Sequence, residues 1–151
     1  MPEIERKFRV HDVPHSLDEG TRLRQAYLAV EGDIEVRVRD HGGTFVLGVK
    51  GGRGLERNEV EVELDQAGFD ELWSLATVRR IDKTRYRLPA SAHTVELDVY
   101  AGSLAGLIVV EVEFTSRQAA ETFTPPPWFG EELTGDPRWS NAALATQGLP
   151  E

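Results

Sequence analysis

The sequence predicts a mainly β fold of the α+β class, in which antiparallel strands form the sheet and a few helices cover it. The first observation is a period-two alternation of polar and apolar residues, which is typical of strands with unlike faces. The second is that short turn signals, such as Glu31-Gly32-Asp33 and His41-Gly42-Gly43, join neighbouring stretches, as in antiparallel hairpins. The third is the length of 151 residues, from which we expect a single domain over residues 1–151.

The strands follow from the alternation, taken in chain order. Eight segments carry it clearly and a ninth carries it weakly. The clear segments are Glu3–Val10, Arg22–Val30, Ile34–Asp40, Thr44–Lys50, Arg57–Leu64, Val78–Leu88, Thr94–Tyr100 and Leu107–Thr115, and the weak one lies near Glu131–Thr134. Further turn signals are the Gly51–Gly54 loop and the stretch Pro89–His93.

Three helices interrupt the strands. Asp65 is placed to cap a helix over Gln66–Ala76, whose apolar residues recur at helical spacing on one face. Ser116 is placed to cap a short helix that runs through Glu121. Ser140 is placed to cap another through Thr146, with Gly148 just beyond its end.

Composition narrows the function classes. The formal net charge of −9 argues against broad contact with nucleic acid or an anionic membrane, so we expect neither as a partner. The absence of cysteine rules out disulfides and thiolate metal sites. The chain has no apolar run of the ~20 residues that a membrane span needs, and its start does not resemble a signal peptide, so we expect a cytoplasmic location. The oligomeric state is left open.

The two faces of the predicted strands differ sharply. One parity is apolar, whereas the other carries ten acids and nine bases in blocks of like charge. The charged residues are Glu3, Glu5, Lys7, Arg9, Glu35, Arg37, Arg39, Lys50, Arg57, Glu59, Glu61, Glu63, Lys83, Arg85, Arg87, Glu96, Asp98, Glu111 and Glu113.

Two interpretations fit this face. It is either the solvated side of an ordinary antiparallel sheet or the inner wall of a closed barrel. Neighbouring residues on the same face of a strand lie ~7 Å apart. The repulsion between like charges such as Glu111 and Glu113 is therefore weak in water, but it requires counter-ions when the face is enclosed. If enclosed, this face carries a charge of −1, and two divalent cations would bring it to +3. Such a basic, metal-loaded interior within an acidic molecule suits a small polyanion such as a chain of phosphates.

Paired glutamates point to a metal. Glu3 and Glu5 lie on one side of the first strand, and Glu111 and Glu113 lie on one side of the last long strand. Four carboxylates from neighbouring strands can surround a hard divalent cation, and oxygen-only ligands favour Mg²⁺ or Mn²⁺.

These motifs, taken in order, resemble the triphosphate tunnel metalloenzymes, also called CYTH proteins, and most of all their short bacterial members. The resemblance runs nearly end to end. Its pieces are Glu3-Ile-Glu-Arg-Lys-Phe8, Gln25-Ala-Tyr-Leu28, Val36-Arg-Val-Arg39, Val49-Lys-Gly51, Arg57-Asn-Glu-Val-Glu61, Lys83-Thr-Arg-Tyr86, Glu96-Leu-Asp-Val-Tyr100, Val110-Glu-Val-Glu113 and the closing residues Trp128, Gly130, Arg138 and Asn141.

The resemblance implies an eight-stranded antiparallel barrel whose tunnel binds a linear triphosphate and hydrolyses it with Mg²⁺ or Mn²⁺. It implies metal ligands at Glu3, Glu5, Glu111 and Glu113. It implies phosphate contacts from Arg37, Arg39, Lys50, Arg57, Lys83 and Arg85. It also implies catalytic roles for Lys7, Glu61, Lys83 and Asp98, and a place for Glu96 beside Asp98.

Two further expectations concern residues of the same parity. Arg87 and Glu35 are expected at a tunnel mouth, where they pair with each other. Tyr27 is expected to be a barrel-wall aromatic rather than a site residue.

The expected activity is hydrolysis of the terminal phosphate of inorganic tripolyphosphate. Thiamine triphosphatase and adenylate cyclase remain alternatives on the same fold, because all three substrates present the same triphosphate. A non-catalytic polyphosphate-binding or nucleotide-binding module is the alternative from a different class.

Overall fold

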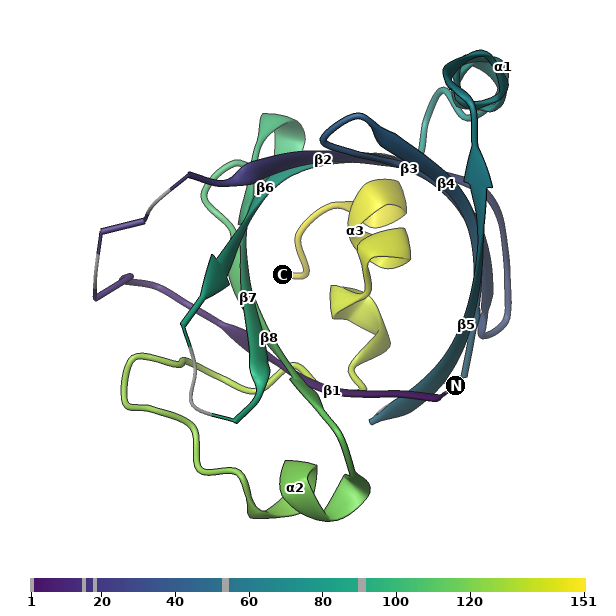
Figure 1. Cartoon of the computed structure of the whole chain (residues 1–151). Helices are drawn as coiled ribbons and strands as arrows, with labels where there is room; N and C mark the ends of the chain where they lie inside the picture. The colour runs from purple at the N-terminus through teal and green to yellow at the C-terminus, as the bar shows by residue number, and fades with distance from the viewer. Residues whose placement is uncertain (1, 15, 18, 53–54, 90–91) are drawn as a thin grey trace.

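The computed structural model describes residues 2–14, 16–17, 19–52, 55–89 and 92–151. In these residues eight antiparallel strands close into a barrel in the order β1-β5-β4-β3-β2-β6-β7-β8, and β8 pairs back onto β1 (Figure 1). The predicted closed eight-stranded barrel is therefore confirmed. The turns predicted at Gly51–Gly54 and Pro89–His93 each lie partly outside the described residues.

The strands lie where the period-two alternation predicted them. Their bounds are β1 Pro2–Arg9, β2 Thr21–Glu31, β3 Ile34–His41, β4 Thr44–Gly51, β5 Glu56–Leu64, β6 Arg80–Leu88, β7 Thr94–Tyr100 and β8 Ile108–Phe114. The weak ninth segment is not a strand, because within Glu131–Thr134 only Glu132 forms a β-bridge, to Phe8. Gly135 follows with a positive φ of 75°, which turns the chain away from β1.

The charged parity of the strands faces the inside of the barrel. Arg37, Lys50, Lys83 and Asp98 are all buried there, with Asp98 only 1% exposed. The interpretation as the solvated face of an open sheet is therefore wrong. The apolar face of the same strands points outward, where helices and the segments after β8 cover much of it.

Two helices cover the outside of the barrel. Helix α1 (Gln66–Leu75) is capped by Asp65, whose side chain accepts from the backbone N–H of Gly68, and it buries Phe69 against the wall formed by β2, β3 and β4. Helix α2 (Arg117–Thr122), capped by Ser116, packs on β1 and β8. Among the described residues, no helix is both long and apolar enough to cross a bilayer.

The C-terminal segment enters the barrel. Helices η2 (Pro137–Trp139) and α3 (Asn141–Gln147, capped by Ser140) lie within the ring of strands when the barrel is viewed along its axis (Figure 1). Trp139 and Leu144 pack there on Ile81, Tyr100 and other apolar side chains. This packing fills part of the tunnel end at which β6 begins and β7 ends.

Candidate functional site

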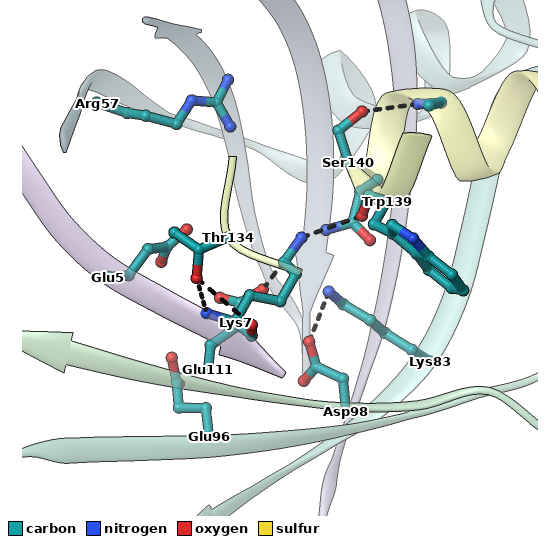
Figure 2. Close-up of polar contacts among 12 residues, drawn as sticks. Glu5, Lys7, Arg57, Lys83, Glu96, Asp98, Glu111, Thr134, Trp139 and Ser140 are labelled. Carbon is teal, nitrogen blue, oxygen red and sulfur yellow. Dashed lines mark hydrogen bonds and ion pairs between the residues drawn. The ribbon is translucent and has the colours of Figure 1, made fainter. Parts of the chain in front are cut away.

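The tunnel holds a cavity of about 150 Å³ that opens to solvent. Inward-facing charges line it from several strands, with Glu5 and Lys7 on β1, Arg37 on β3 and Lys50 on β4. Glu111 of β8 completes this wall, and Thr134 and Asn141 of the C-terminal segment also line it. Figure 2 shows Glu5, Lys7, Glu111 and Thr134 gathered around the same space.

The four predicted metal-binding glutamates lie on the neighbouring strands β1 and β8. Glu5 and Glu113 are directly opposite each other in the register, and Glu111 is opposite Lys7. Burial, together with the charges of Glu111 and Glu3, raises the pKa of Glu5 to about 8, although Lys50 opposes this. Burial and the nearby Glu3 also raise the pKa of Glu113, which is exposed near the end of β8.

Lysines stand among these carboxylates. Lys50 Nζ lies 3.5 Å from a Glu3 oxygen and 3.8 Å from a Glu5 oxygen, and Lys7 Nζ lies 3.9 Å from Glu111. Burial would raise the pKa of Glu111, but Lys7 and its other cationic neighbours outweigh it and lower that pKa. Glu111 is therefore ionised at neutral pH, whereas Glu5 retains its proton.

The donor set fits a hard divalent cation. All four side chains offer carboxylate oxygens. Burial and the like charges of Glu111 and Glu3 raise the pKa of Glu5, and a bound cation would relieve both effects. The described residues nevertheless contain no group of three metal-ligating side chains gathered closely enough to hold an ion as they stand. Binding an ion therefore requires these carboxylates to draw together and Lys50 to move away from Glu3 and Glu5.

The predicted phosphate-binding cations form two groups. At the tunnel end that the C-terminal segment partly fills, Arg37 is paired with Glu59 at 2.6 Å and Arg57 with Glu35 at 3.4 Å. Lys50 lies beside the glutamates of β1. Arg39 lies deeper, where its Nε donates to the Gln25 side chain at 3.1 Å. Arg37, Lys50 and Arg57 line the cavity directly.

The second group is a buried ion-pair cluster of Lys83, Arg85 and Asp98. Lys83 is completely buried, and its Nζ lies 2.8 Å from an Asp98 oxygen without the alignment of a hydrogen bond (Figure 2). Arg85 donates two hydrogen bonds to the same carboxylate. Burial lowers the pKa of Lys83 to about 8, whereas Lys83 and Arg85 overcome burial to lower the pKa of Asp98. With two cations and one carboxylate, this ion-pair cluster carries a net positive charge while Lys83 is protonated.

The remaining predicted residues lie apart from the cavity wall. Glu61 is exposed on β5 and lies on the same face as Arg37, with Gly48 of β4 between the two residues in the register. Glu96 pairs with Arg85 at 3.4 Å and with the exposed Arg87 at 3.7 Å. The expected pairing of Arg87 with Glu35 is wrong, because Glu35 lies at the opposite end of the tunnel and pairs with Arg57.

Sequence reasoning missed several side chains of the site. Tyr27 lines the cavity rather than only the wall, and Gln25 is buried beside it. Both have the inward parity of β2, which is the signal that could have found them. Thr134 and Asn141 also line the cavity, but they come from outside the strands, where parity gives no information.

Comparison with known proteins gives concordant matches. The CYTH domain matches residues 1–134. An inorganic triphosphatase of Nitrosomonas europaea is 47% identical over 148 residues, covering 96% of this chain and 97% of the relative. One from Acetivibrio thermocellus is 37% identical, covering 94% and 92%.

Solved structures agree with the sequence relatives. The crystal structure of an inorganic triphosphatase matches with a TM-score of 0.74 at 42% identity, covering 98% of this chain and 97% of that one. The CYTH domain thus matches most of the chain, and the curated relatives and the solved structure align over nearly its full length. The chain belongs to the CYTH domain family.

Proposed function

We propose that the protein is a divalent-metal-dependent triphosphatase that releases the terminal phosphate of inorganic tripolyphosphate within its tunnel. The observation that carries the proposal is the cavity that Arg37, Lys50 and Arg57 line together with Glu5 and Glu111. Cations for a polyanion and carboxylates for a metal thus share one space. The near full-length relatives named inorganic triphosphatase support the same substrate.

Six cationic side chains would hold the phosphate chain. They are Arg37, Arg39, Lys50, Arg57, Lys83 and Arg85. Several already have carboxylate partners, such as Glu59 for Arg37 and Glu35 for Arg57. These partners compensate the buried positive charge before substrate binds, because an enclosed unpaired cation is costly. Phosphate oxygens would then compete with the carboxylates for the same guanidinium groups.

Glu3, Glu5, Glu111 and Glu113 would hold the metal, which we propose to be Mg²⁺ or Mn²⁺. When bound, the ion would neutralise charge on the phosphate oxygens. Because Glu5 retains its proton at neutral pH, ion binding must release that proton. Lys50, freed from Glu3 and Glu5, would be available to phosphate.

Four residues are proposed to act on the reacting groups. Glu61, which solvent reaches, would orient the attacking water. Lys7 would stabilise charge on the phosphate chain, from a position that the Trp139 carbonyl holds by accepting from Lys7 Nζ at 3.2 Å. Lys83 would do the same from the deeper end, with Asp98 holding its ammonium group. A Lys83 pKa of about 8 leaves most of that ammonium charged at neutral pH.

The test is phosphate release from tripolyphosphate, ATP and thiamine triphosphate in parallel, with Mg²⁺, with Mn²⁺ and with EDTA. We expect metal-dependent release with tripolyphosphate strongly preferred. A preference for thiamine triphosphate, or formation of cyclic AMP from ATP, would replace the proposed substrate by one of the alternatives. Binding of tripolyphosphate without any release would favour the non-catalytic module.

Location and partners stay predictions. The cytoplasmic location, and the absence of nucleic acid and membrane as partners, rest on composition and charge alone. Fractionation of cells that express the tagged chain would test the location.

A further inference from the structure

Gln25 is a fully buried polar side chain on β2 that has no part in the proposed function as stated so far. Its exposed fraction is 0%, and it faces the tunnel interior between Arg39 and Tyr27. A buried amide is costly unless its donors and acceptors are satisfied. The partners of its two polar atoms therefore fix how the amide is oriented.

Arg39 sets the orientation of the Gln25 amide. Arg39 Nε donates to Gln25 Oε1 at 3.1 Å, and because a guanidinium has no acceptor, the amide atom that faces it must be the oxygen. The amide nitrogen consequently points the other way, where Gln25 Nε2 donates to the Tyr27 hydroxyl oxygen at 3.0 Å.

The proton of the Tyr27 hydroxyl points away from Gln25. Gln25 Nε2 is itself a donor, so the hydroxyl oxygen faces it and the hydroxyl proton needs an acceptor elsewhere. Tyr27 lines the cavity, where a bound ligand would offer one. Burial raises the pKa of Tyr27 to about 12, so the proton is present at neutral pH.

We propose that Gln25 is a positioning residue that holds the Tyr27 hydroxyl as a hydrogen-bond donor aimed into the cavity, toward an oxygen of the bound phosphate chain. Tyr27 touches the substrate, and Gln25 acts through it. This inference rests on the proposed function, because it takes tripolyphosphate as the ligand of the cavity. It assigns to β2 a contribution that the charged residues of the tunnel do not provide.

The test compares Gln25→Glu with Gln25→Met. The glutamate keeps the shape and the bond from Arg39 but can only accept, so the Tyr27 proton turns toward it and away from the cavity. Methionine removes both hydrogen bonds but leaves that proton free. The proposal predicts a loss of kcat/KM of about tenfold for Gln25→Glu and of less than about threefold for Gln25→Met.

The same two variants made in a Tyr27→Phe background complete the experiment, with thermal melting as the check on folding. Gln25→Glu should cost clearly less there than in the wild type, because only the effect of its added charge beside Arg39 remains once the hydroxyl is gone. An equal cost in both backgrounds would overturn the proposal. If Gln25→Glu does not fold, a Gln25→Met effect that is unchanged by Tyr27→Phe would also overturn it.

Calorimetric titration with tripolyphosphate separates this inference from the proposed function. If the wild type binds tripolyphosphate but releases no phosphate, the hydrolase proposal fails. Weaker binding by Gln25→Glu than by the wild type would still support the positioning role, provided that the difference is clearly smaller when both proteins also carry Tyr27→Phe. Equal binding by Gln25→Glu and the wild type would overturn that role.

Discussion

Replacing Glu5 by glutamine should make the protein more stable than the wild type at alkaline pH. Glutamine has nearly the shape of a protonated glutamate and carries no charge. In the wild type, burial together with Glu111 and Glu3 raises the pKa of Glu5 from 4.5 to about 8. A group whose folded pKa is raised contributes stability that is present below its unfolded pKa and lost as the pH rises through the folded value.

The magnitude follows from that shift. At about 1.4 kcal/mol per pKa unit, the wild type should lose up to about 5 kcal/mol of unfolding free energy as the pH rises from the unfolded pKa through the folded pKa of Glu5. Glu5→Gln lacks this loss, so its stability relative to the wild type should rise steadily across the same range. Added Mg²⁺ should stabilise the wild type at high pH more than it stabilises the variant.

The assay is urea denaturation at a series of pH values that brackets both pKa values, in EDTA, with Glu121→Gln as the matched control. Glu121 is exposed on α2, so that variant should follow the wild type at every pH. If the stabilities of Glu5→Gln and the wild type stayed parallel over the whole range, the assignment of Glu5 as a protonated, crowded carboxyl would be refuted. A variant less stable than the wild type at the alkaline end would mean that Glu5 is ionised and paired with Lys50.

Three further outcomes are expected. Glu113→Gln should lower turnover of tripolyphosphate at least about tenfold without lowering the melting temperature, and unchanged turnover would contradict its role as a metal ligand. Arg39→Ala should mainly raise KM, so an effect confined to kcat would contradict its place on the substrate. Phe69→Ala removes a side chain that is only 1% exposed and should lower the unfolding free energy by about 3–5 kcal/mol. Leu75→Ala, at a position 74% exposed, should lower it by less than about 0.5 kcal/mol. Similar losses for both variants would contradict the packing of α1.

Local patterns predicted most of the fold. The alternation placed the eight strands within a few residues, and it separated the inner from the outer face because side chains on a strand alternate strictly. The caps at Asp65, Ser116 and Ser140 were also predicted, since a capping side chain bonds to backbone only two or three residues away.

Contacts between distant strands could not be predicted in the same way. Parity gives the face of a residue but not its register, so it placed Glu35 and Arg87 on one face without showing that they lie at opposite ends. Equally, it gave no indication that Lys50 pairs with Glu3 and Glu5. The entry of η2 and α3 into the barrel depends on packing against Ile81 and Tyr100, which no local signal contains.

The central claim is that the glutamates of β1 and β8 and the cations of the tunnel act together on one phosphate chain. Phosphate release from tripolyphosphate by the wild type and by Glu111→Gln, with Mg²⁺ and again after EDTA, tests it most directly. The account predicts rapid release by the wild type with Mg²⁺, and loss of release on adding EDTA or on replacing Glu111. Release that persists in EDTA, or that Glu111→Gln leaves unchanged, would contradict it.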